Sequence, residues 1–222
     1  MPLLSGSLTS RSYRVLDPIP KDFRSAFLQE IRKNVFHPPA PEKGEMHSAG
    51  WVNPRNPLDT ALNWEKILFS HYMTLALRVD RLSVNPRLFR PQLMEAISRV
   101  ASEKKRTLTR AERLAIAADL RVKILKRQTP STAIYEAAWN VRDHRVHFSA
   151  SGEKINLTFQ DFFTATFGVR LDPMLPYVRA EDFARRQKLT ASLESLSPDH
   201  FSPYLSEKIQ KAAASNSDDE EG

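Results

Sequence analysis

The sequence predicts an α+β fold, in which a mixed or antiparallel sheet packs against amphipathic helices, with a basic helix pair and a polar C-terminal tail. Segments with apolar residues at every second position alternate with segments whose apolar residues recur at three- and four-residue steps. Apolar residues become sparse towards the C-terminus. We therefore expect one α+β domain over residues 1–178 and a polar, partly helical tail over residues 179–222.

The first part of the chain predicts a strand followed by a helix. Residues 12–16 alternate polar and apolar side chains, as a half-buried strand does, and prolines at positions 18 and 20 end the alternation. Apolar residues then recur at four-residue steps, at Phe23, Phe27, Ile31 and Val35. The prolines of segment 38–41 end this amphipathic helix.

The middle of the chain predicts a central strand and two consecutive helices. Residues 67–82 form a long β-compatible run with apolar residues on one parity. Asn85, followed by a proline, opens the first helix, because asparagine caps a helix and proline suits its first position. Thr109 and Glu112 are spaced as a capping box and open the second helix.

Two further segments complete the predicted domain. Residues 132–141 and 145–149 are rich in aromatic and β-branched residues at alternate positions, which predicts a hairpin that turns near Asp143. Residues 156–167 have helical spacing, and Gly168 supplies the stop.

The tail combines short helical segments with an acidic end. Residues 180–196 and 203–214 predict two polar helices, whereas residues 215–222 predict disorder. One hypothesis is that the four acids of segment 218–221 fold back onto the basic helices and compete with an anionic ligand. The alternative is a solubilising tail.

Composition excludes several classes of protein. The chain has no cysteine, so it has no disulfide framework, no thiolate nucleophile and no cysteine-based zinc site. The N-terminus lacks the pattern of a secretory signal, and no apolar run approaches the roughly 20 residues that cross a bilayer. We therefore expect a soluble cytoplasmic protein with no membrane partner.

The strongest functional indication is the charge of the two central helices. Segment 86–130 holds twelve Lys and Arg and four Asp and Glu, a net charge of +8 within a chain whose total is +7. A localised positive field attracts polyanions by long-range steering and counterion release. DNA is therefore the first partner to consider, through its phosphate backbone. The candidate DNA-binding residues are Arg99, Lys104, Lys105, Arg106, Arg110, Arg113, Lys123 and Arg127.

The ordinary alternative is that these charges only solvate exposed helices. At 100° per residue, one apolar stripe on the second helix consists of Leu114, Ala118, Val122 and Leu125. This stripe predicts the face that docks on the protein. Ile116 and Leu120 lie on the cationic side, so part of that side is alternatively buried against another element or a second subunit. A module that oligomerises or docks an acidic partner is thus the alternative function.

Catalysis finds little support in the sequence. The glycine-rich phosphate-binding motifs and the G-x-S-x-G serine motif are absent. His144 and His147 are three apart, a spacing that places them on opposite faces of a strand and disfavours a metal pair. The acids at positions 59, 80, 143 and 153 match no known magnesium signature, so a metal-dependent nuclease is the least favoured hypothesis. We expect no enzymatic activity and no cofactor.

The three tryptophans are potential base-stacking residues, as single-strand binding requires. Trp51 and Trp139 lie in apolar segments, so we expect them in the core. Trp64 lies between polar residues and is expected to be the most accessible of the three.

Several segments match, in order, the N-terminal region of one bacterial family. They are the opening strand 13–16, the helix that ends in Val35 and Phe36, the Gly-Trp-Val segment of residues 48–54, the strand 75–81 followed by Asn85 and Pro86, the charged helix pair, and the run to Phe167 and Gly168. Over roughly residues 12–176 the chain resembles the RdgC family of recombination-associated proteins.

This resemblance implies an α+β protein that binds DNA without sequence preference and restrains recombinase (RecA) filaments. It further implies a homodimer, usually a ring around duplex DNA, and a location at the nucleoid in the cytoplasm. Members of the family are typically longer, with further domains that help to close the ring. This chain instead continues into a short polar tail, so we carry over no residue of those domains.

Overall fold

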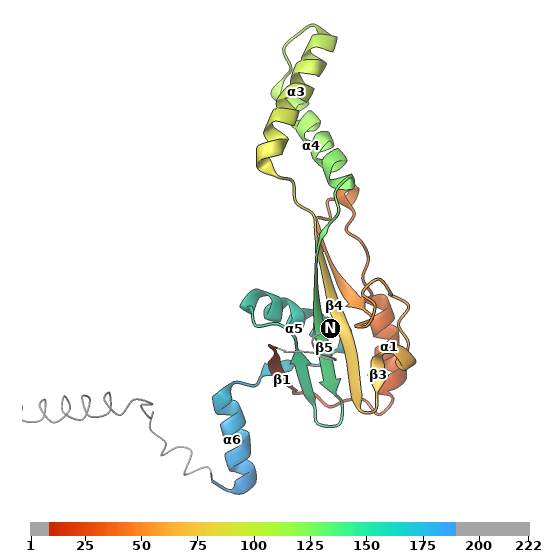
Figure 1. Cartoon of the computed structure of the whole chain (residues 1–222), viewed down its shortest axis with the longest axis vertical. Helices are drawn as coiled ribbons and strands as arrows, with labels where there is room; N and C mark the ends of the chain where they lie inside the picture. Colours follow the sequence, from red (N-terminus) through yellow and green to blue (C-terminus); the bar gives the residue numbers. More distant parts are fainter. Residues whose placement is uncertain (1–8, 190–222) are drawn as a thin grey trace, which may run out of the picture. The chain divides into compact units, whose positions relative to one another are not determined.

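The computed structural model describes residues 9–189 and divides the chain after Met174 into two units. In the first unit, the described strands form one seven-stranded antiparallel sheet with helices (Figure 1), which confirms the α+β fold class. The described part of the second unit holds helix α6 (Pro176–Gln187). The expectations for residues 203–214 and for the acidic end lie outside the described residues.

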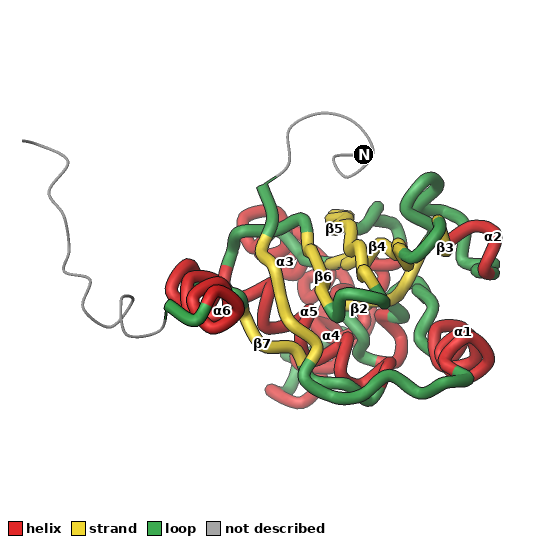
Figure 2. The backbone as a smooth tube through the Cα atoms, turned by 90° about the horizontal axis from the view of Figure 1, so that it is seen from below, coloured by secondary structure: helices red, strands yellow, loops and turns green. Residues whose placement is uncertain are grey.

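The sheet brings together strands that are far apart in sequence. Its order is β2 (His47–Val52), β4 (Tyr72–Arg81), β5 (Ser131–Asn140), β6 (Arg145–Phe148), β1 (Arg11–Val15) and β7 (Leu171–Pro173), with β3 (Leu68–Phe69) paired to β4 beside this path. The β4–β5 ladder runs from Tyr72 opposite Asn140 to Arg81 opposite Ser131. In Figure 2, which views the molecule from below, the strands overlap in a twisted row.

The expected central strand over 67–82 is interrupted. It divides at Ser70 and His71 into the short β3 and the long β4, and Ser70 takes a left-handed φ of 57°. The chain folds back at this point, so that Leu68 lies opposite Met73. The expected strand at 12–16 and the expected hairpin are confirmed by β1, β5 and β6.

Two predicted helices build the core. α1 (Phe23–Lys33) and α5 (Glu153–Phe167) contact each other, and their aromatic residues pack with the sheet residues in one cluster. The ring of Phe27 lies 5.4 Å from that of Trp139 and 5.2 Å from that of Phe167. α5 ends at Gly168, whose φ of 67° is the left-handed conformation that glycine adopts without strain.

The tryptophans are distributed as the sequence predicts. Trp51 and Trp139 are buried in the core, and the indole N–H of Trp51 donates to Thr166 Oγ1 at 3.0 Å. Trp64 opens the short α2 (Trp64–Ile67) and is half-buried, with its N–H donated to the carbonyl of Arg24. It is the most accessible of the three, but its ring already packs at right angles to that of Phe23, with centres 6.2 Å apart.

Gly50 allows a second segment to cover the edge of β2. The Trp51 amide donates to the Asn34 carbonyl and the Phe36 amide donates to the Trp51 carbonyl, so residues 34–36 run along this strand. A Cβ at Gly50 would lie 2.2 Å from Phe36 Cα, which is too close for any other residue. The Gly-Trp-Val segment therefore has a structural explanation.

The opposite face of the sheet carries a smaller cluster formed by Phe36, Val52 and Ala76. Beside it, the Arg78 guanidinium lies 4.2 Å from the centre of the Phe36 ring and 2.8 Å from the buried carboxylate of Asp80. This ion pair is held between the aromatic ring and the strand, which stabilises a charge that burial alone would disfavour.

A helical hairpin connects β4 to β5. α3 (Pro86–Lys104) and α4 (Arg110–Lys126) pack against each other and extend beyond the ends of these strands (Figure 1). Both predicted caps are present. The side chain of Asn85 accepts a hydrogen bond from the Arg87 amide, and Thr109 and Glu112 form the capping box. At its base, α4 contacts the short 3-10 helix η1 (Pro41–Lys43).

Candidate nucleic-acid interface

The two helices of the hairpin meet along one line of half-buried residues, which we call the seam. No residue of α3 is buried, and Leu125 is the one buried residue of α4. Half-buried apolar residues instead line the two helices, among them Phe89, Leu93, Ile97, Ile116, Leu120 and Ile124. The remaining faces of both helices are exposed to solvent, so their residues are free to contact a ligand.

The docking face predicted for the second helix is confirmed only in its C-terminal half. Leu114 is 62% exposed and Ala118 is exposed, whereas Val122 is half-buried and Leu125, at the base of the hairpin, is buried. The inner face is formed by Ile116 and Leu120, on the side that also carries cations. α4 thus has two apolar stripes, and covered residues come from both of them.

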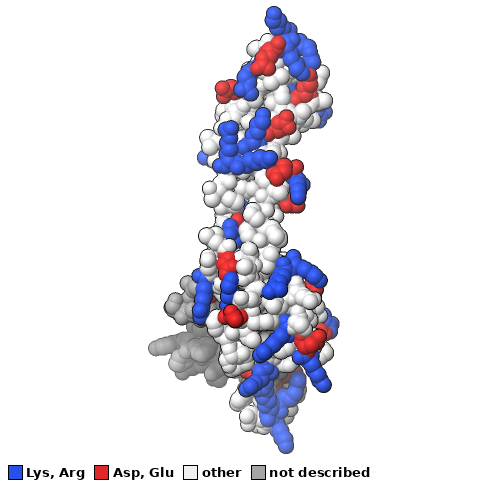
Figure 3. Space-filling view, turned by 90° about the vertical axis from the view of Figure 1, so that its right-hand side faces the viewer, with Lys and Arg blue, Asp and Glu red and all other residues white. Residues whose placement is uncertain are grey.

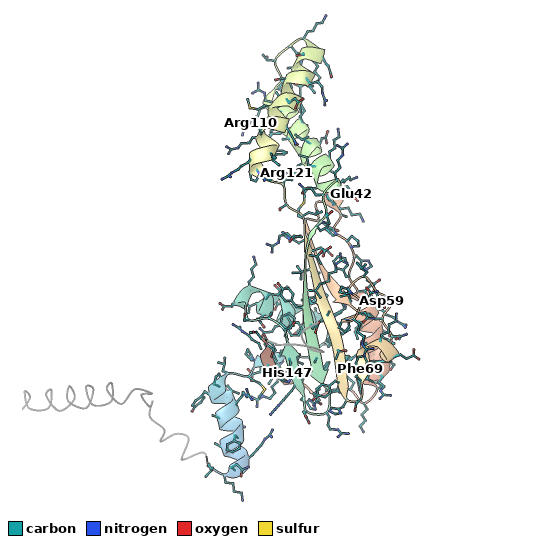
Figure 4. All side chains as sticks on the ribbon, in the orientation of Figure 1. Glu42, Asp59, Phe69, Arg110, Arg121 and His147 are labelled. Carbon is teal, nitrogen blue, oxygen red and sulfur yellow. The ribbon has the colours of Figure 1, made fainter. Side chains whose placement is uncertain are left out.

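All eight predicted DNA-binding residues are exposed. Figure 3 shows Lys and Arg side chains at the end of the hairpin and again midway along it, with some Asp and Glu among them. Figure 4 labels two arginines of α4, Arg110 near its start and Arg121 further towards the base. The guanidinium of Arg121 lies 5.5 Å from the centre of the Phe89 ring and so links α4 to α3.

Two of the predicted cations already share the carboxylate of Glu112 in ion pairs. Lys104 Nζ and Arg106 Nη2 each lie 2.7 Å from Glu112 Oε1. Hydrogen bonds from Arg106, Lys104 and the Thr109 amide hold the pKa of Glu112 well below its usual range. The sequence predicts Glu112 only as a capping residue, although its carboxylate also reaches Lys104 at the end of α3 and Arg106 in the loop.

The other six predicted residues make no ion pair with any residue between 9 and 189. They are Arg99, Lys105, Arg110, Arg113, Lys123 and Arg127. α4 has 17 residues, so it is roughly 25 Å long. One DNA strand carries roughly seven phosphates over that length. Because like charges left unpaired repel each other, an anionic partner that follows the hairpin would relieve them.

The cations do not share one face. On α4, Arg110 and Lys123 point about 140° apart around the helix axis. Such a distribution suits several separate phosphate contacts and provides no shaped pocket for a single base. It fits a ligand recognised by its charge.

The structure does not bring the candidate catalytic acids together. Asp59 pairs with Lys66, Asp80 with Arg78, and Asp143 accepts a hydrogen bond from Asn140. Among residues 9–189, no group of three or more His, Asp or Glu is placed to hold a metal ion. His144 lies in the β5–β6 turn with φ 52°, and His147 lies on β6 (Figure 4).

Comparison with models of known protein families and with curated proteins finds no match for this chain. Among the described helices, none has the length and the apolar character required to cross a membrane.

Proposed function

We propose that the protein binds DNA without sequence preference, through contacts between DNA phosphates and the hairpin of α3 and α4. The observation that carries this proposal is the set of six exposed Lys and Arg residues that lack ion pairs within residues 9–189. Contacts of this kind position a protein on DNA and carry no base information.

The resemblance to the RdgC family extends this proposal to a role in recombination. In that role the protein, associated with the nucleoid as a homo-oligomer, restrains recombinase filaments on the DNA that it covers. The order of the matching segments supports this part of the proposal, and the hairpin cations support the DNA contact.

A salt titration tests DNA binding. For about five neutralised phosphates, the logarithm of the binding constant falls with the logarithm of the salt concentration at a slope of about −4 to −5. A variant with Lys105, Arg110 and Arg113 changed to Gln is expected to reduce the magnitude of this slope by about 2.7 and to melt like the wild type. A wild-type slope near zero would refute the proposal.

The matched control changes three exposed cations outside the hairpin, Lys21, Arg24 and Arg142, to Gln. It lowers the net charge by the same amount, so it separates a defined interface from a general effect of charge. The proposal requires the hairpin variant to lose clearly more affinity than this control.

A second candidate function is a protein-interaction module. It is favoured by the outward apolar face of α4, where Leu114 is exposed between the exposed alanines 111, 115 and 118. Light scattering on the wild type and on Leu114→Asp tests self-association, with Leu58→Asp as the control because Leu58 is 79% exposed outside the hairpin. If Leu114→Asp leaves the molar mass in solution unchanged, this face of α4 is not the contact between copies of the chain.

A further inference from the structure

A pocket lies between the start of α5 and the ends of β4 and β5 from which the hairpin emerges. Its volume is about 450 Å³, within the usual range of small-molecule sites. Half-buried residues form an apolar part of the lining, namely Val79, Ala133, Tyr135 and Ile155. None of the hairpin residues considered above lines it.

The charge around the pocket is positive. Arg81, at the end of β4, and Lys154, in the first turn of α5, both line it and are exposed. Neither makes an ion pair with a described residue, and Glu153 is the one carboxylate in the lining. The free amides in the first turn of α5 add partial positive charge. An anion is therefore the ligand that this rim would favour.

The apolar part of the lining contains one aromatic ring. Tyr135 packs on the core through Phe148, with ring centres 5.8 Å apart, and its remaining surface lines the pocket. Its hydroxyl, and that of Ser131 on the same wall, have no hydrogen-bond partner in residues 9–189. The pocket thus places an aromatic ring and two hydroxyls beside two unpaired cations.

We propose that this pocket binds one nucleotide unit, with the base against Tyr135 and the phosphate between Arg81 and Lys154. The same chemistry is offered by a free mononucleotide and by an unpaired nucleotide of single-stranded DNA. Stacking on an aromatic ring combined with phosphate contacts is how single strands are held without sequence preference. In its strand-bound form this inference rests on the proposed DNA binding, and it adds a preference for unpaired strands.

The experiment titrates three probes: thymidine monophosphate, single-stranded hexathymidylate and a short duplex. The pocket variant is Arg81→Gln with Lys154→Gln, two exposed positions whose change leaves the core intact. We expect this variant to bind hexathymidylate about tenfold more weakly or worse, and to bind duplex nearly as the wild type does. Tyr135→Phe should retain binding and Tyr135→Leu should weaken it, because only the leucine removes the ring. Lys21→Gln with Arg24→Gln is the charge-matched control.

Each outcome has a distinct meaning. If free nucleotide competes with hexathymidylate, the pocket accepts both sources; if only the oligonucleotide responds to the pocket variant, the ligand is a strand. If the pocket variant binds all three probes like the wild type, this inference is overturned while hairpin-dependent duplex binding still stands. If duplex binding shows no salt dependence but thymidine monophosphate binding requires Arg81 and Lys154, the proposed function fails and the pocket remains.

Discussion

The sheet core and the helical hairpin obey different physical rules. In the core, enclosed polar groups are mostly hydrogen-bonded: the Tyr13 hydroxyl donates to Asn156 Oδ1 at 2.6 Å, and both residues are fully buried, whereas the indole N–H of Trp139 has no partner among residues 9–189. In the hairpin, α3 buries no residue and most cations lack a partner among the described residues. Substitutions should therefore affect stability in the first region and binding in the second.

The largest expected effect is that of Gly50→Ala in the core. The added methyl group would lie 2.2 Å from Phe36 Cα and 2.4 Å from its amide nitrogen, so the backbone itself must move. We expect a loss of about 3 kcal/mol in the free energy of unfolding, measured by urea denaturation.

Gly152→Ala is the matched control, because its added Cβ would meet only Ile155 Cγ2, at 3.7 Å. Its effect should stay within about 0.5 kcal/mol of the wild type. Equal losses in the free energy of unfolding would show that the close approach of the Phe36 backbone does not explain why residue 50 is glycine.

Asp80→Asn should have the next largest effect. The change leaves Arg78, whose side chain is 17% exposed, without its carboxylate, and we expect a loss of about 2 kcal/mol at pH 7. Burial raises the pKa of Asp80, but hydrogen bonds from Arg78 and Thr132 outweigh it, so the pKa lies below its usual value.

The lowered pKa of Asp80 makes the stability of the protein depend on pH. A lowered folded-state pKa stabilises the protein above the unfolded pKa of about 4, and this stabilisation is lost as the pH falls through the folded value. The deficit of Asp80→Asn should therefore shrink in denaturation experiments below about pH 4. A deficit that stays constant down to pH 2 would contradict the assignment.

In the hairpin, Glu112→Gln should strengthen binding. It removes the carboxylate that pairs with Lys104 and Arg106, while glutamine still serves in a capping box. If both freed cations reach phosphates, the slope of the salt titration becomes steeper by about 1.8. Glu95→Gln is the control, because it removes an equal charge from an exposed carboxylate that pairs with no described residue. Equal behaviour of the two variants would mean that the freed cations do not touch DNA.

The sequence predicted the elements that local rules define. The capping box at Thr109, the glycine stop at Gly168 and the strand β5 each depend on neighbouring residues, and the structure confirms all three, although residues 136–140 of β5 are buried on both faces and do not alternate. The turn at Ser70 was missed because the residues on both sides of it favour strands.

The candidate interface was predictable in composition but not in pairing. The exposure of the eight cations follows from their position on solvent-facing helices and on the residues that adjoin the helix ends. Which apolar residues of α4 are covered depends on how α3 packs against it. Which cations pair with Glu112 depends on the loop that brings Lys104 and Arg106 back to it. Both are tertiary contacts that spacing along one helix does not encode.

The smallest expected effect concerns the ion pair between the hairpin and the short helix η1. Lys126 Nζ lies 3.7 Å from Glu42 Oε2, with both side chains about half exposed, near the base of α4 where Figure 4 labels Glu42. Such pairs contribute about 0–1 kcal/mol, so Glu42→Gln should change the free energy of unfolding by less than about 0.5 kcal/mol. The same change frees Lys126 for DNA and should steepen the salt slope by at most about 0.9. A large loss of stability without a change in the salt slope would show that this contact anchors the hairpin. The contrast between a stabilising core and a binding hairpin would then not hold for the residues at the base of the hairpin.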